Sequence, residues 1–327
     1  MAVVHRSARR AASGIAIVLI VLGVGIPLSA DAQGSSHPLD TAAKNGAGAA
    51  ASFTVGTLTV QRSGERGRPV ILIPGLASGA WVWDAASAHL AADHVVYTVT
   101  LAGFDGIPLP SAPGNLIDRA DSSLLALIRT RHIEKPVLIG HSLGGMLAIR
   151  LATEHPELLG GVIAADGLPI FPGAENMTPA QLSVMSRDMI AQVGTASPEA
   201  FRSQQLGYMQ RVGVIDPDTA AKYAKLTARS DPMATAIYAT QDLAIDLRPS
   251  LAKATVPILE ISPYFAADVA APPMSLSEAQ KTAYYEKLLA GAPNARVISI
   301  SPSRHFVMLD QPQRFIQTVD DFLANMK

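Results

Sequence analysis

The 327-residue sequence contains no cysteine. Disulfides, thiolate nucleophiles and thiolate metal ligands are therefore excluded, as is a lipoprotein anchor, which requires a cysteine at its cleavage site. Charged residues are scarce at 16%, whereas hydrophobic residues make up 49%, and the formal net charge is only −1. Beyond the extreme N-terminus there is no basic run, so we expect no nucleic-acid partner. This composition predicts a folded protein with a well-buried core.

The N-terminal residues have the pattern of a targeting segment. Three arginines precede the apolar stretch 15–26, and residues 30–32 (Ala-Asp-Ala) form a small-residue cleavage site. We therefore expect a signal peptide over residues 1–32 and an exported protein, periplasmic or secreted, with no stable membrane anchor after cleavage. The alternative is an uncleaved anchor, because the uncharged stretch 11–30 is nearly long enough to span a bilayer.

Strand and helix patterns alternate along most of the chain. Residues 33–52 are rich in Ala, Gly, Ser and Asn and predict a flexible leader. The alternation after it predicts an α/β fold, with a mostly parallel sheet flanked by helices. The expected strands are 53–60, 70–73, 95–101, 136–140, 161–165, 256–261 and 296–300, and the expected helices are 116–131, 143–155, 276–289 and 315–326. The pattern indicates mainly helices over residues 168–250, so we predict a core of 53–167 and 251–327 with a helical cap inserted after the strand 161–165.

Residues 140–144 contain the motif G-x-S-x-G, centred on Ser142. The motif alone is a weak signal, but here a predicted strand precedes it and a predicted helix follows it. That order predicts a sharp turn that holds Ser142 exposed as a nucleophile, with flanking glycines that avoid Cβ clashes. The helix N-terminus then offers N–H groups to a developing oxyanion. The alternative is a glycine-rich turn in which the serine only caps the helix.

A general base can be found by elimination. Where a serine occupies such a turn, the acid and then the histidine follow it along the chain. Only His155 and His305 follow Ser142. His155 lies at the far end of the helix that Ser142 begins, about 20 Å away. His305, between the last strand and the last helix, is therefore the expected base, and the alternative is a structural surface histidine.

The acid that orients the imidazole has two candidates. Its usual place is the loop after the strand 256–261, but Asp268 comes a few residues later there than expected. Asp166 ends the strand 161–165 and is followed by Gly167, so it projects from a tight turn. We prefer Asp166 and leave Asp268 open; Asp166 could instead simply cap the turn. For the oxyanion hole we expect the N–H groups of Leu143 and Leu76.

Three segments resemble the α/β-hydrolase superfamily: residues 73–76 (Ile-Pro-Gly-Leu), 140–145 (Gly-His-Ser-Leu-Gly-Gly) and 304–310 (Arg-His-Phe-Val-Met-Leu-Asp). The resemblance spans residues 53–327 and is greatest to capped bacterial hydrolases in which a stretch like Asp-Gly-Leu-Pro (166–169) follows the sixth strand. It implies the α/β-hydrolase fold and a Ser-His-Asp triad. Such sequences often lack an acid after the seventh strand, which favours Asp166. A serine nucleophile disfavours dehalogenase and epoxide hydrolase chemistry.

These residues together predict a serine hydrolase that forms an acyl-enzyme. We expect neither a metal nor another cofactor, because no ligand motif is present. Leu168, Phe171 and Met177 are expected to line a substrate pocket, although packing of the cap on the core explains them equally well. An apolar pocket favours a small-molecule ester or lactone. The alternatives are an amidase or aminopeptidase with the same triad and a non-catalytic binding protein.

Overall fold

The computed structural model describes residues 51–111, 114–269 and 276–326, so the predicted signal peptide lies outside the described residues. Within these ranges, eight strands form one sheet in the order β1-β2-β4-β3-β5-β6-β7-β8. The strands are β1 (Ala51–Val55), β2 (Leu58–Ser63), β3 (Pro69–Ile73), β4 (Val95–Leu101), β5 (Val137–His141), β6 (Gly161–Ala165), β7 (Ile258–Pro263) and β8 (Ala295–Ile300). No described helix combines the length and the apolar character needed to cross a membrane.

The six strands from β4 to β8 in this order pair in parallel, which confirms the predicted mostly parallel sheet. The prediction of one strand over residues 53–60 is wrong, because β1 and β2 form an antiparallel hairpin there. Gly56 has a φ of +56°, a conformation that glycine adopts readily and that reverses the chain. Since β1 begins at Ala51, the last two residues of the predicted leader (33–52) belong to the sheet.

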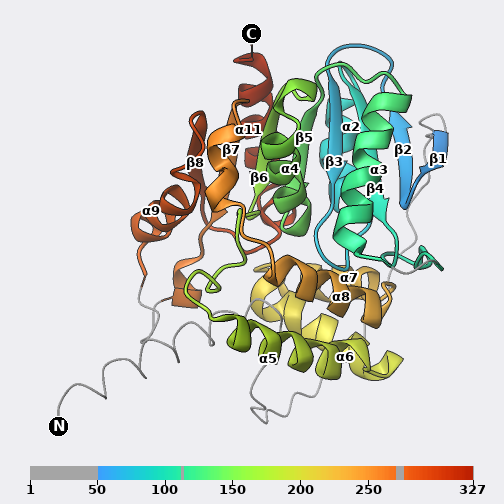
Figure 1. Ribbon diagram of the computed structural model, residues 1–327, viewed down its shortest axis with the longest axis vertical. Helices are drawn as coiled ribbons and strands as arrows, with labels where there is room; N and C mark the ends of the chain where they lie inside the picture. The colour runs from blue at the N-terminus through green and yellow to red at the C-terminus, as the bar shows by residue number, and fades with distance from the viewer. Residues whose placement is uncertain (1–50, 112–113, 270–275, 327) are drawn as a thin grey trace.

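Helices cover both faces of the sheet (Figure 1). On one face α2 (Asp84–Leu90) packs against β4 and α11 (Pro312–Ala324), and Trp83 is buried there against Phe315. On the other face α3 (Leu116–Thr130) packs against the β1–β2 hairpin, and α4 (Leu143–Glu154) lies against β5 and β6. The remaining core helices, α9 (Glu278–Leu289) and the short α10 (Val307–Asp310), flank β8 in the sequence.

Four helices lie between β6 and β7, as the predicted helical insertion requires. They are α5 (Pro179–Met189), α6 (Pro198–Tyr208), α7 (Pro217–Thr227) and α8 (Pro232–Leu243). Each begins with proline directly after a side chain that accepts a hydrogen bond from the first turn: Thr178, Ser197, Asp216 or Asp231. Proline and a polar cap both favour a helix start, so local sequence defines these boundaries. Figure 1 shows the insertion below one end of the sheet.

The chain enters and leaves the insertion side by side. Ile170 and Asp246 form an isolated antiparallel bridge, and the Leu247 N–H donates to the Pro169 carbonyl at 2.8 Å. Backbone pairing at this point fixes the two connections of the insertion to the core.

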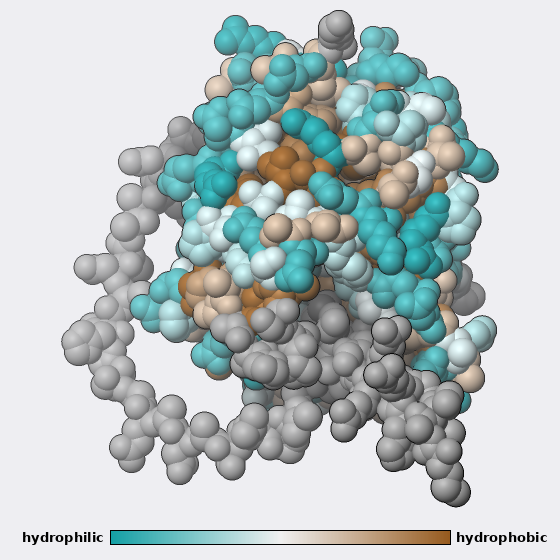
Figure 2. Space-filling model, turned by 90° about the vertical axis from the view of Figure 1, so that its left-hand side faces the viewer, coloured by the Kyte–Doolittle hydropathy of each residue, from teal (hydrophilic) through white to brown (hydrophobic). Residues whose placement is uncertain are grey.

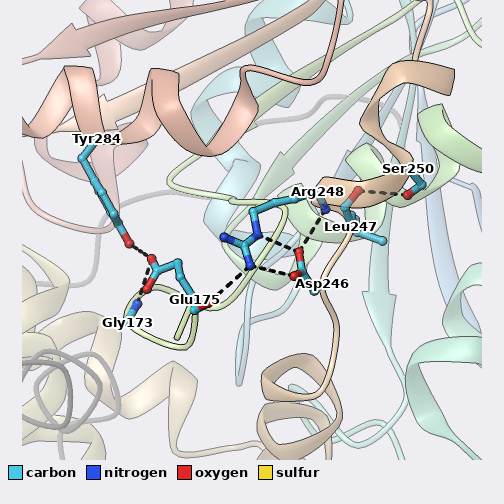
Figure 3. A network of polar contacts seen from close by, with 7 residues as sticks. All are labelled: Gly173, Glu175, Asp246, Leu247, Arg248, Ser250 and Tyr284. Atoms are coloured by element: carbon cyan, nitrogen blue, oxygen red, sulfur yellow. Dashed lines mark hydrogen bonds and ion pairs between the residues drawn. The ribbon is translucent and has the colours of Figure 1, made fainter. Parts of the chain in front are cut away.

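A polar network reinforces this junction (Figure 3). The Arg248 guanidinium donates to both carboxylate oxygens of Asp246 and also reaches the Glu175 carbonyl oxygen. The Glu175 carboxylate in turn accepts hydrogen bonds from the Gly173 N–H and the Tyr284 hydroxyl of α9. The network therefore ties both ends of the insertion to a core helix.

Candidate active site

Ser142 occupies the turn between β5 and α4, with φ of 53° and ψ of −120°. A non-glycine residue in this region is strained by about 1–3 kcal/mol, and the surroundings must hold it there. The Ser142 N–H donates to the Ala165 carbonyl at 3.0 Å, which anchors the turn to the end of β6. A Cβ added to Gly140 would lie 2.1 Å from the Gly144 carbonyl oxygen, so the motif glycines are sterically required. The result is a partly buried serine at the start of a helix.

His305 and Asp166 form a close pair at the same edge of the sheet. The His305 Nδ1 lies 2.5 Å from the Asp166 Oδ2, and the two side chains are only 11% and 14% exposed. Asp166 has a φ of 52°, and its N–H donates to the Ile261 carbonyl of β7. The carboxylate therefore comes from the end of β6, which is the position preferred from the sequence.

Several groups determine the charge of Asp166. Burial alone would raise its pKa, whereas the His305 imidazole and its hydrogen bond to the carboxylate lower it. The Lys281 ammonium and a hydrogen bond donated by the Tyr285 hydroxyl add to the lowering. The pKa of Asp166 therefore lies well below the usual carboxyl value, and the group is ionised at neutral pH.

The alternative acid, Asp268, has a different partner. Its two carboxylate oxygens accept hydrogen bonds from the Arg304 guanidinium at 2.6 and 2.8 Å. The same guanidinium donates to the carbonyl oxygens of Gln210 and Val214. Asp268 thus helps to hold the residue just before His305, whereas the structure brings Asp166 to the imidazole itself.

His141, the residue before the serine, is a contact that the sequence reasoning missed. It is fully buried, and its Nε2 lies 3.0 Å from the backbone carbonyl oxygen of His305, to which it donates. Its ring packs on those of His305 and Phe306, each with a centroid separation of 4.5 Å. Burial lowers the pKa of His141 well below its usual value, so the ring is neutral. The only sign of this contact in the sequence is that a histidine occupies the variable position before the serine in G-x-S-x-G.

The loop that carries His305 is hydrogen-bonded to the insertion. The His305 N–H donates to the Val212 carbonyl at 3.1 Å, and the Phe306 N–H donates to the Gly213 carbonyl at 2.9 Å. Both acceptors belong to the π-helical turn Met209–Gly213 that ends α6. The neighbouring Tyr208 ring meets the His305 ring edge-on at 6.2 Å between centroids. The insertion therefore supports the backbone of this loop and contacts the imidazole.

The predicted oxyanion loop lies against the nucleophile. A Cβ added to Gly75 would lie 3.0 Å from the Ser142 Cβ and 2.7 Å from the His141 Nδ1. Leu76 follows directly in this loop, and Leu143 is the first residue of α4, where the helix has no acceptor for its N–H. Both expected donors are thus near the serine, and their role stays a prediction.

The three predicted substrate-binding residues belong to one apolar cluster. Leu168 and Phe171 are 5% and 8% exposed, and Met177 packs against this cluster in a partly buried position. The cluster also includes residues of α8 and α9, and Leu76 of the oxyanion loop contacts it. Most of the surface of Leu168 and Phe171 is therefore used for packing, at a place that adjoins the site.

A second buried carboxyl group lies beside Asp166. Glu260 of β7 is fully buried, accepts the Gly167 N–H at 3.2 Å, and has no partner for its Oε2 among the described residues. Burial, together with the negative charge of Asp166, raises the pKa of Glu260 well above the usual value, so this group is protonated. Within the described residues, no group of three or more His, Asp or Glu side chains is arranged to hold a metal ion.

The strand order and the strained serine between β5 and α4 define an α/β-hydrolase fold. Residues 70–318 match the alpha/beta hydrolase family, and the chain belongs to that family.

Individual relatives agree with this assignment. The chain is 24% identical over 272 residues to a pimeloyl-[acyl-carrier protein] methyl ester esterase of Aeromonas hydrophila, covering 82% of this chain and 100% of that protein. A thermophilic esterase from Thermogutta terrifontis has a TM-score of 0.68 at 18% identity, over 85% of this chain and 99% of the other. An enol-lactonase from Burkholderia xenovorans has a TM-score of 0.61 at 20% identity, over 84% and 100%. The two structures share the fold with this chain.

Proposed function

We propose that this protein is a serine hydrolase that cleaves small carboxylic esters or lactones through an acyl-enzyme. The observation that carries the proposal is the His305–Asp166 pair, 2.5 Å apart, at the edge of the sheet where Ser142 is held in its strained turn. A buried, ionised carboxylate on Nδ1 fixes the imidazole so that Nε2 is free to accept a proton. Such a pair activates a neighbouring serine hydroxyl in serine hydrolases, and we propose that it does so for Ser142.

In the proposed mechanism, Ser142 attacks the substrate carbonyl while His305 takes the hydroxyl proton. The N–H groups of Leu76 and Leu143 stabilise the negative charge on the carbonyl oxygen. The C–O bond to the leaving group breaks, and His305 returns its proton to that oxygen. Water then attacks the acyl-enzyme with His305 again as base, which releases the acid and restores the Ser142 hydroxyl. Asp166 stays ionised and stabilises the imidazolium in both halves.

The substrate class is supported by the surroundings and by the relatives. The cluster of Leu168, Phe171 and Met177 adjoins the oxyanion loop and is apolar, which suits an uncharged acyl or alcohol group. Named relatives include a methyl ester esterase, an esterase and an enol-lactonase. We further propose that residues 168–250 act as a cap over this site, and that residues 1–32 direct export to the periplasm or medium.

The decisive test is a panel of esters, lactones and amides assayed with the mature protein and with Ser142→Ala. We expect turnover of short to medium acyl p-nitrophenyl esters or of lactones, and a loss of about 10⁴-fold or more in the variant. Ser142 should also be labelled covalently by a fluorophosphonate probe. Turnover of amides alone would indicate an amidase, and absence of both turnover and labelling would refute catalysis.

A further inference from the structure

Two residues on one side of α9 interact with the carboxylate of Asp166, Tyr285 through a hydrogen bond and Lys281 through its charge. Tyr285 is 4% exposed, and its hydroxyl donates to the Asp166 Oδ1, the oxygen that does not bind His305. Lys281, one turn earlier, donates to the Pro263 carbonyl, and its Nζ lies 5.5 Å from the centroid of the Tyr285 ring. Residues four apart share a helix face, so both side chains belong to the inner side of α9.

The outer side of α9 has a different character. Helix α9 lies beside β8 at the left of Figure 1, and Figure 2 shows that side of the molecule, where hydrophilic residues surround small apolar areas. Ala279, Ala283 and Glu286 are exposed, whereas Tyr285, Leu288 and Leu289 are buried. A surface helix normally buries apolar side chains alone, so the tyrosine hydroxyl and the lysine on its inner side require another explanation.

We propose that Tyr285, supported by Lys281, is a positioning residue that fixes the Asp166 carboxylate for its hydrogen bond to His305. This inference rests on the proposed function. The carboxylate comes from the end of β6 on a backbone with positive φ, so its orientation depends on its side-chain partners. With one oxygen on the imidazole and the other on the phenol, the plane of the carboxylate is fixed.

The charges around Asp166 determine how removal of the Tyr285 hydroxyl would affect the Asp166–His305 pair. The polar groups that interact with Asp166 are His305, His141 of β5, Tyr208 of α6, Glu260 of β7, and Lys281 and Tyr285 of α9. Burial and the charge of Asp166 raise the pKa of Tyr285, so the phenol keeps its proton and can only donate to the carboxylate. Without this hydrogen bond the carboxylate is less well compensated, and it attracts the imidazolium of His305 more strongly.

The chain offers a matched control at the adjacent position. Tyr284 also donates its hydroxyl to a carboxylate, but that carboxylate belongs to Glu175 in the junction network (Figure 3). The two tyrosine rings pack against each other at 5.9 Å between centroids. Tyr285→Phe and Tyr284→Phe therefore delete the same atom from the same helix, and only the first deletion affects Asp166.

The test is the pH dependence of Ser142 labelling by a fluorophosphonate probe, which requires no knowledge of the natural substrate. For Tyr285→Phe we expect labelling at pH 7 to slow about tenfold and the acid limb of the profile to move to higher pH by about half a unit or more. Tyr284→Phe should keep the wild-type profile. Lys281→Met should move the acid limb of the labelling profile in the same direction by a smaller amount. If Tyr285→Phe does not fold, the Lys281→Met variant provides the test.

The two hypotheses fail in different ways. If the wild-type protein is not labelled, the proposed function fails. If the wild type is labelled but the profile of Tyr285→Phe coincides with that of Tyr284→Phe, only the positioning role of Tyr285 is refuted. A lower melting temperature without a shift of the acid limb likewise identifies a merely structural residue.

Discussion

The segments that follow β6 and β7 each supply an aspartate near the same short loop, yet the two carboxylates have different partners. Asp166 binds the imidazole of His305, whereas Asp268 binds the guanidinium of Arg304, one residue earlier. The first pair is nearly buried, and the carboxylate of the second is 36% exposed. Arg304 and His305 are neighbours in one loop, but only the contact of His305 with Asp166 is a candidate catalytic contact. The contact of Arg304 with Asp268 supports the loop, so the partner determines the role of each aspartate.

The largest expected effect tests this difference directly. Asp166→Asn should reduce kcat on an ester by about 10⁴-fold, because an amide cannot stabilise the imidazolium or hold the correct tautomer. Asp268→Asn is the same chemical substitution but leaves Asp166 in place, so we expect kcat to fall less than tenfold. Steady-state kinetics of both variants decide the matter, and the reverse order of losses would assign the acid to Asp268.

The next largest effect concerns the support that His141 gives to His305. His141→Phe keeps a ring against those of His305 and Phe306 but removes the donor to the His305 carbonyl. An unsatisfied buried acceptor costs about 1–3 kcal/mol, so we expect kcat to fall about tenfold or more with little change in KM. His155→Phe, at the far end of α4, serves as the control. Equal kinetics for the two variants would show that the hydrogen bond does not position the base.

A smaller effect should appear in stability as a function of pH. The pKa of Glu260 is raised in the folded protein, so folding favours its protonated form. The contribution of Glu260 to the free energy of unfolding is therefore fully present at low pH. It is lost as the pH rises from the ordinary carboxyl pKa of the unfolded chain towards the raised pKa of the folded protein. Glu260→Gln resembles the protonated form at every pH. We therefore expect the variant to gain stability relative to wild type on going from pH 5 to pH 8, by on the order of 1 kcal/mol.

Thermal unfolding at a series of pH values measures this difference, and activity provides the second readout. Because the amide resembles the neutral acid in shape, Glu260→Gln should retain near wild-type turnover. A pH-independent stability difference would mean that Glu260 is ionised in the folded protein, contrary to its environment.

The smallest expected effect completes the comparison of the two aspartates. The Asp268–Arg304 pair is partly exposed, and such pairs contribute about 1 kcal/mol or less. Asp268→Asn should therefore lower the melting temperature by no more than about 3 °C, and less in high salt. Calorimetry at two salt concentrations checks this, and a larger loss that salt does not reduce would show that the pair has a deeper structural role.

The sequence predicts the sheet and the candidate residues Ser142, His305 and Asp166 because each depends on local pattern or on chain order. Alternating periodicity identifies strands, and the glycines around Ser142 follow from the crowding of one tight turn. Chain order leaves a single histidine at the correct edge. The hairpin at Gly56 was missed because one alternating run gives no sign of a reversal at an isolated glycine.

The supporting contacts of the site could not be predicted in the same way. Tyr285 meets Asp166 across 119 positions of sequence, and His141 meets His305 across 164. No local periodicity encodes such pairs, since they form only when the fold brings distant helices, strands and loops together. Glu260 was missed for a related reason, because a carboxyl group within an apolar strand becomes informative only when its buried neighbours are known.

The two main-chain hydrogen bonds from His305 and Phe306 to the π-helical turn Met209–Gly213 have a consequence for engineering. Substrate preference in such a protein would naturally be altered by grafting a foreign segment in place of residues 168–250. Any such chimera must present two carbonyl oxygens where Val212 and Gly213 now present theirs, or the histidine loses its backbone restraint. Shorter exchanges confined to α5 and α8 leave that restraint intact and are the safer route to new specificity.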